Sequence, residues 1–116
     1  MTKKRIAQEA ENNTAYALFK AGFSELLTEN HYNLVHAKSV RLRTCSAEVF
    51  ETENFYLLKS YNTFVAVISK ATNICADVLR TEYDYTATSA QHIAKFISDY
   101  GDRYARRYTA RNLLDV

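Results

Sequence analysis

The sequence predicts an α+β fold: an N-terminal helix, a four- or five-stranded antiparallel sheet, and a second helix packed on one face. Apolar residues recur every three or four positions near the N-terminus and again over residues 89–100, whereas residues between 40 and 79 alternate with a period of two. The chain has no proline and only two glycines, so nothing resembles a flexible interdomain linker. We therefore expect one domain spanning residues 1–116.

The first helix is expected over roughly residues 4–29. Its second half carries an apolar stripe with helical spacing. The stripe comprises Tyr16, Phe19, Phe23, Leu26 and Leu27. Residues 12–14 (Asn-Asn-Thr) have poor helix propensity and mark a weak point that is not expected to break the helix.

The strands are expected to form an antiparallel meander. In residues 40–45, Val40 and Leu42 are predicted to face the core while Arg41 and Arg43 face water. Further apolar, β-rich strands are predicted at 55–61, 63–69 and 74–79. The connections between them are too short for parallel crossovers, and Asn73 suits a positive φ in the last hairpin loop.

The second helix is predicted from Ser89 to Tyr100, with Thr88 or Ser89 as its N-cap and Gly101 just beyond its end. Its apolar face should pack on the sheet. Beyond Gly101, residues 103–111 alternate weakly and suit either an edge strand or a loose tail.

Composition excludes several classes of protein. The net charge of +2 is too small for strong general attraction to nucleic acid, and no apolar run approaches the ~20 residues needed to cross a bilayer. No signal peptide is recognisable, and Cys45 and Cys75 lack the spacing of a zinc site. We expect a cytoplasmic protein with free thiols that uses no metal or other cofactor.

A helix start rich in hydroxyl groups surrounds one histidine, and it allows two interpretations. In the first, Thr86, Thr88, Ser89 and His92 form a structural corner where the chain enters the second helix. In the second, His92 is a general base beside a hydroxyl nucleophile, but no carboxylate stands at a diagnostic spacing to orient it. No glycine-rich loop supports a phosphate site. We therefore expect a structural corner and no enzymatic activity.

Four arginines and two tyrosines interleave near the C-terminus and form the best candidate binding segment. Arginine pairs with phosphates and tyrosine offers a stacking platform, so the segment suits nucleic acid, although an acidic protein surface fits equally well. Arg41 and Arg43 on the first strand are expected to extend this patch. The segment comprises Arg103, Tyr104, Arg106, Arg107, Tyr108 and Arg111.

Two smaller clusters of charged or titratable residues are explained without a functional role. His31 and His36 lie five positions apart without a nearby thiol or carboxylate, so they are not expected to bind metal. Glu48, Glu51 and Glu53 form an acidic run that is expected to lie in a solvated turn between strands, although such a run can also mimic phosphates.

Residues 60–66 (SYNTFVA) are similar to an S-Y-x-T-x-V-A pattern, and residues 85–96 (YTATSAQHIAKF) are similar to Y-S/T-x-T-T/S-x-x-H-x-x-x-F. In this order and at this spacing, the two segments together resemble a family of short uncharacterised proteins of bacteriophages and plasmids. The resemblance covers about residues 55–101 and implies an accessory gene of a mobile element. It transfers no activity.

The resemblance and the tyrosine-rich composition lead to a functional hypothesis. We expect a non-catalytic protein that binds and inhibits a bacterial defence protein or ribonucleoprotein, such as a CRISPR nuclease, in the host cytoplasm. The alternative is a nucleic-acid-binding accessory protein that uses the C-terminal arginines. An exposed edge strand would also permit pairing between copies, as a homodimer.

Overall fold

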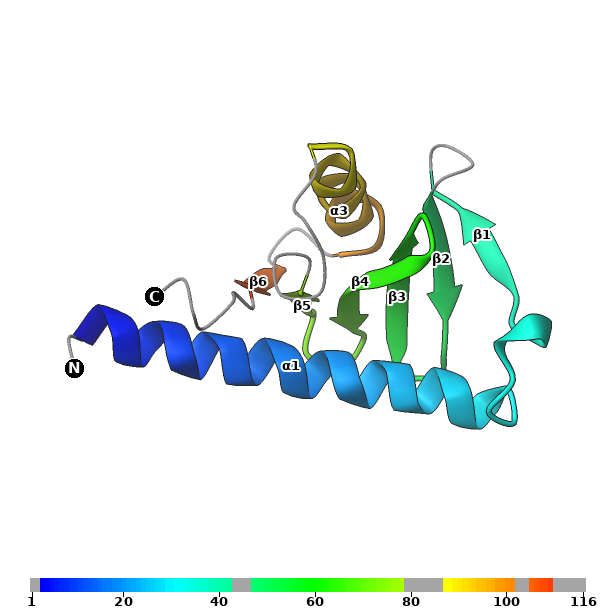
Figure 1. Cartoon of the computed structure of the whole chain (residues 1–116), viewed down its shortest axis with the longest axis horizontal. Helices are drawn as coiled ribbons and strands as arrows, with labels where there is room; N and C mark the ends of the chain where they lie inside the picture. Colours follow the sequence, from blue (N-terminus) through cyan, green and yellow to red (C-terminus); the bar gives the residue numbers. More distant parts are fainter. Residues whose placement is uncertain (1–2, 43–46, 79–86, 102–104, 110–116) are drawn as a thin grey trace.

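A six-stranded sheet lies between two helices in the computed structural model, which describes residues 3–42, 47–78, 87–101 and 105–109 (Figure 1). The strands are β1 (Ser39–Arg41), β2 (Ala47–Glu51), β3 (Phe55–Ser60), β4 (Thr63–Ser69), β5 (Ile74–Asp77) and β6 (Arg106–Thr109), and they follow one another across the sheet in that order. The helices are α1 (Lys3–Glu29) and α3 (Ala87–Tyr100), with a short 3₁₀ helix η1 (Leu34–His36) before β1. The predicted α+β class is confirmed.

The sheet is antiparallel from β1 to β5, as the short connections predict, and parallel between β5 and β6. It contains one strand more than the upper expectation. The additional strand within the sheet is β2, because Glu48 and Glu51 belong to it and do not lie in a turn between strands as expected. Ala47 and Val49 point to one buried face and Phe50 to the other, so the acidic residues are interspersed in a strand that is otherwise buried.

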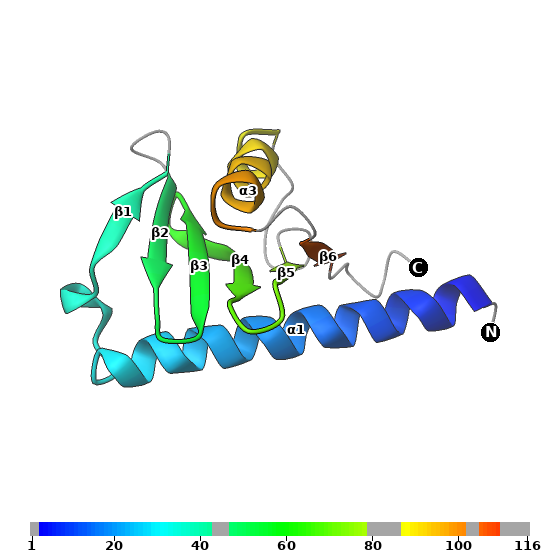
Figure 2. The ribbon, with the colours of Figure 1, turned by 180° about the vertical axis from the view of Figure 1, so that it is seen from behind.

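The helices pack on different sides of the sheet, and neighbouring residues of β3 show the division. Leu57 joins a cluster with Leu26 of α1, whereas the next residue, Leu58, joins a cluster with Ile93 of α3. Successive side chains of a strand face opposite ways, so each helix has its own core. Figure 2 shows α1 running along the sheet and α3 on the other side of β4 and β5.

α1 is one continuous helix, as predicted, despite the run of poor helix formers at residues 12–14. Tertiary contacts compensate for the weak propensity, because Asn12 is fully buried and Ala15 packs against β5. Gly22 lets α1 approach the sheet closely: a Cβ at this position would lie 2.8 Å from Cγ1 of Val67.

The boundaries of α3 differ from the expectation. The helix begins at Ala87, so Thr88 and Ser89 lie inside its first turn and neither is the N-cap. At its other end Gly101 follows as expected, with its N–H bonded to the carbonyl of Ile97 at 2.9 Å. Gly101 has no positive φ; a side chain is excluded there because a Cβ would lie 2.6 Å from the carbonyl oxygen of Ile97.

The first strand is also different from its prediction. β1 is three residues long, and Val40, which was expected to be buried, is 62% exposed. The reason is its place in the sheet: β1 is an edge strand, and the contacts of α3 are concentrated on β3 and β4. The predicted positive φ at Asn73 is confirmed at 56°.

Candidate functional site

The end of β3 and the first two turns of α3 meet in space through a buried polar cluster. Ser60 ends β3, and its Oγ lies 2.9 Å from Nδ1 of His92 and 3.0 Å from Oγ of Ser89, both on α3. Three hydrogen-bonding groups that would be costly to bury alone therefore satisfy one another. Ser89 and His92 of the expected corner therefore contact Ser60, and the cluster joins α3 to the β3–β4 hairpin.

Burial lowers the pKa of His92 below its ordinary value of 6.5, because the charged imidazolium loses hydration there. His92 is the sixth residue of α3, deeper in the helix than the third or fourth position that an N-cap at Ser89 or Thr88 would give it. A neutral ring at pH 7 lets Nδ1 donate to Ser60 or accept from it, depending on the tautomer.

The same three residue types could form a nucleophile and a base, so their accessibility matters. Ser60 is 2% exposed and His92 is 5% exposed, and Ser89 is also buried. A nucleophilic hydroxyl has to contact its substrate. Because Ser60 Oγ is enclosed, a structural role is favoured for Ser60 and His92.

Tyr61 lies beside this cluster at the turn between β3 and β4. Its φ is 57°, in the left-handed region that favours glycine, and its ring centroid is 6.0 Å from that of His92. The side chain remains 56% exposed. Tyr61 therefore covers the buried hydroxyl–imidazole cluster with an aromatic ring while holding a strained backbone.

The C-terminal arginines are only partly available for binding. Arg107 on β6 forms an ion pair of 2.5 Å with the buried carboxylate of Asp77 on β5, and Tyr108 packs against the cluster formed by Ala15, Ala76 and Val78. Arg106 is exposed. Arg103, Tyr104 and Arg111 of the predicted segment lie outside the described residues.

The expectation that the first-strand arginines extend this patch is wrong for Arg41. β1 and β6 are opposite edges of the six-stranded sheet, so about 24 Å of sheet separates them at ~4.8 Å per strand. Arg43 and Thr86 lie outside the described residues.

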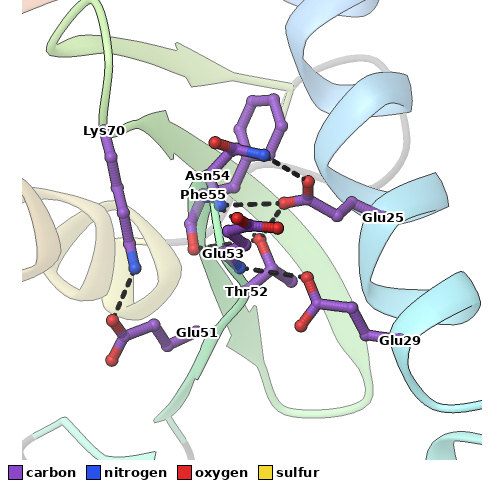
Figure 3. A network of polar contacts seen from close by, with 8 residues as sticks. All are labelled: Glu25, Glu29, Glu51, Thr52, Glu53, Asn54, Phe55 and Lys70. Carbon is purple, nitrogen blue, oxygen red and sulfur yellow. Dashed lines mark hydrogen bonds and ion pairs between the residues drawn. The ribbon is translucent and has the colours of Figure 1, made fainter.

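A network of carboxylates fastens the β2–β3 turn to α1 (Figure 3). Glu25 accepts hydrogen bonds from the Thr52 hydroxyl, from the backbone N–H of Asn54 at 3.0 Å and from its side-chain amide at 2.6 Å. Glu29 accepts from the backbone N–H of Glu53 at 3.0 Å. These contacts provide acceptors for the N–H and hydroxyl donors of the tight β2–β3 turn. The network therefore has a structural explanation.

The pKa of Glu25 reflects this network. Partial burial raises it, but the hydrogen bonds from Thr52 and Asn54 and the charge of Lys70 together outweigh burial, so the net pKa lies below 4.5. Lys70 also pairs with Glu51 at 2.5 Å. The acidic run expected in a solvated turn is therefore partly engaged with the fold.

Large apolar side chains are exposed mainly at one end of the sheet. Tyr32 is 76% exposed, Val35 84% and Val40 62%, and all three lie between the end of α1 and β1. Sequence reasoning missed this surface because Val40 has the pattern of a core residue. We call it the η1–β1 surface, and it comprises Tyr32, Val35, Lys38 and Val40.

The part of the chain that the structure describes offers few other candidates for a functional site. No group of three or more metal-ligating side chains occurs among these residues. Cys75 is buried, and burial together with Asp77 raises the pKa of its thiol to about 12, so it is unreactive. Within the same residues, neither helix has the length and apolar character needed to span a membrane.

Residues 25–111 match a family of unknown function, DUF8033, and the chain belongs to this family. The match covers all six strands and α3, and it includes the buried Ser60–Ser89–His92 cluster and the η1–β1 surface. Neither the curated proteins nor the solved structures contain a match.

Proposed function

We propose that this protein is a non-catalytic accessory protein of a bacteriophage or another mobile element, which binds and inhibits a bacterial defence component such as a CRISPR nuclease. It would act in the cytoplasm of the host. The resemblance of residues 55–101 to short phage and plasmid proteins supports the genetic context.

The η1–β1 surface is the single observation that carries the binding hypothesis. Exposed apolar side chains grouped on one surface mark interaction sites more often than scattered ones do. Tyr32 has the amphipathic ring that dominates binding energy at protein interfaces, and Val35 and Val40 supply apolar area beside it. Lys38, which is also exposed, would favour an acidic partner.

The nucleic-acid alternative receives less support. It requires arginines and tyrosines that are free to meet phosphates and bases. Arg107 is already paired with Asp77, and Tyr108 packs against the cluster between α1 and β5. We therefore place the binding surface at β1 and not at β6.

A panel of purified defence effectors, each tested for co-purification with this protein, addresses the proposal directly. Parallel assays should measure phage survival in cells that carry the same defence systems. Val35→Asp should abolish both binding and protection, because it replaces the most exposed apolar side chain of the η1–β1 surface with a charge. Ala21→Asp, at an exposed position of α1 outside that surface, is the matched control and should leave both unchanged. Absence of binding and protection across a broad panel would contradict the proposal.

A further inference from the structure

We infer that two copies of this chain associate through the outer edge of β1, and that their β1 strands pair antiparallel about a two-fold axis at Val40. The inference goes beyond the proposed function and is tested on the protein alone. In the dimer Val40 belongs to the contact between copies. Tyr32 and Val35 precede β1 in the chain and are left to a defence component.

An apolar row crosses the sheet and ends at the exposed side chain of Val40. From the centre of the sheet outward the row consists of Ala66, Leu58, Val49 and Val40, each opposite the next. The first three are at most 3% exposed, whereas Val40 is 62% exposed. Register thus places Val40 in a core row, but its position at the edge leaves it in water. An apolar side chain on an added strand would complete the row.

The backbone of β1 faces outward at the two residues that flank Val40. The N–H of Leu42 donates to the carbonyl of Ala47 at 2.9 Å, which makes these two residues a hydrogen-bonded pair. Hydrogen-bonded pairs alternate along an antiparallel ladder, so the main-chain groups of Val40 face β2, and those of Ser39 and Arg41 face the outer side. No further strand lies on this side among the described residues (Figure 1).

The reversed β1 of a second copy matches these positions. A two-fold axis at Val40 sets the two Val40 side chains opposite each other as a non-hydrogen-bonded pair, in which cross-strand side chains lie closest. Ser39 of each copy then lies opposite Arg41 of the other copy, where the two residues exchange main-chain hydrogen bonds. Lys38 lies opposite Leu42, so no like charges stand directly opposite each other.

The charges at the edge suit the chain's own arginine. Glu48 lies directly opposite Arg41 in the same chain, and its carboxylate reaches diagonally to accept a hydrogen bond from the Ser39 hydroxyl at 3.3 Å. The position opposite Ser39 on an added strand therefore lies beside a carboxylate, and in the dimer Arg41 of the second copy occupies it. Arg41 already has an interaction within its own chain, but a guanidinium carries several N–H donors and can serve both.

The two edges of the sheet differ in how they discourage pairing. β6 carries exposed Arg106 and Arg107 in succession, and charged side chains of this kind protect an edge. β1 instead has Val40 at its centre. A foreign strand would have to bring an apolar residue followed by a basic one, and β1 itself has both in Val40 and Arg41. The β1 edge therefore fits a second copy of the chain.

Sedimentation equilibrium of the full chain from about 10 μM to about 1 mM tests for the dimer, since a small interface is weak. The mass should rise with concentration from that of one chain toward that of two. Val40→Lys and Val40→Glu should each weaken self-association at least about tenfold, because identical charges then meet at the two-fold axis.

An equimolar mixture of the Val40→Lys and Val40→Glu variants is the decisive sample. Opposite charges then meet at the axis, so association should return to within about threefold of that of the unaltered chain. Ala21→Asp, at an exposed position of α1, is the control and should leave association unchanged. Thermal melts establish that each variant is folded.

A chain that stays monomeric over this range overturns the inference, as does a dimer that is insensitive to the single variants or a mixture that does not recover. If the chain is monomeric and Val40→Lys abolishes binding to a defence component, that component occupies the edge: the inference is wrong and the proposed function stands. A dimer that recovers in the mixture but binds no effector of the panel supports the inference and contradicts the proposed function alone.

Discussion

Ser60 and His92 are separated by 32 positions in the sequence, yet Ser60 Oγ and His92 Nδ1 lie 2.9 Å apart in a buried site. This contact ties the end of β3 to the second turn of α3, and Ser89 completes it. It joins the β3–β4 hairpin to α3, and it does so without exposing a reactive group.

Ser60→Ala should lower the free energy of unfolding by about 1–3 kcal/mol, because it removes the buried hydroxyl that contacts His92 Nδ1 and Ser89 Oγ. Urea denaturation measures the change. Thr88→Ala, at an exposed position of the same helix, should change stability by less than about 0.5 kcal/mol. Equal effects of the two substitutions would show that the buried contact contributes nothing.

Stability should fall as the pH is lowered through and below 6.5 because of His92. Its pKa in the folded protein is lower than the ordinary 6.5, so the unfolded chain takes up the proton first. The contribution is therefore fully present above pH 6.5 and is lost as the pH falls through the lowered pKa. Urea unfolding at several pH values, compared with His92→Gln, measures it, and the variant should show a shallower slope between about pH 7.5 and 5. Identical slopes would contradict the assignment.

Glu25→Ala should destabilise the protein by about 1–3 kcal/mol, since Thr52 and Asn54 lose the acceptor that fastens their turn to α1. The pKa of Glu25 is lowered, so its contribution is present above pH 4.5 and disappears as the pH falls through the lowered value. Acid titration of stability separates this effect from that of His92. Glu53→Gln, in the same exposed turn, is the matched control and should change stability by less than about 0.5 kcal/mol.

Gly22→Ala should destabilise the protein by about 1–3 kcal/mol, although alanine is the better helix former. The new Cβ would lie 2.8 Å from Cγ1 of Val67, a stiff side chain in the core. Thermal unfolding measures whether the substitution stabilises or destabilises the protein. Ala21→Gly, at the neighbouring exposed position, reports helix propensity alone and should cost about 0.5–1 kcal/mol. A stabilised Gly22→Ala variant would show that α1 and β4 can separate at no cost.

The two described arginines of β6 should behave differently. Arg107→Ala should cost about 1–3 kcal/mol, because the carboxylate of Asp77 is buried and loses an ion-pair partner. Arg106→Ala, at an exposed position, should be nearly neutral. Calorimetric unfolding of both variants measures this difference in stability. If Arg106→Ala is the more damaging, β6 has an organisation other than the one described.

Local patterns predicted most of the fold. The apolar stripe of α1, the two hairpins between Phe55 and Asp77 and the packing of α3 follow from periodicity and turn chemistry. The missing strand, β2, mixes Glu48 and Glu51 with buried residues, and acidic residues weaken the signal of a strand. The parallel pairing of β5 with β6 joins residues about thirty positions apart, and no local pattern encodes such a pairing.

The candidate site was less predictable than the fold. His92 and Ser89 stood out because they lie together in sequence, but their partner Ser60 is fixed only by the registration of α3 on the β3–β4 hairpin. Val40 carried the alternation of a core residue. Its exposure depends on which strands α3 covers, and that is a tertiary property.

The order of the strands also has a consequence during synthesis. Every pairing from β1 to β5 joins neighbours in the chain and closes within a short loop, so this part of the sheet can assemble as it leaves the ribosome. The side of β5 that receives β6 must wait until residues 106–109 emerge. Until then the nascent chain bears an uncovered sheet edge that includes Asp77, and we expect chaperone contacts or premature association to concentrate there.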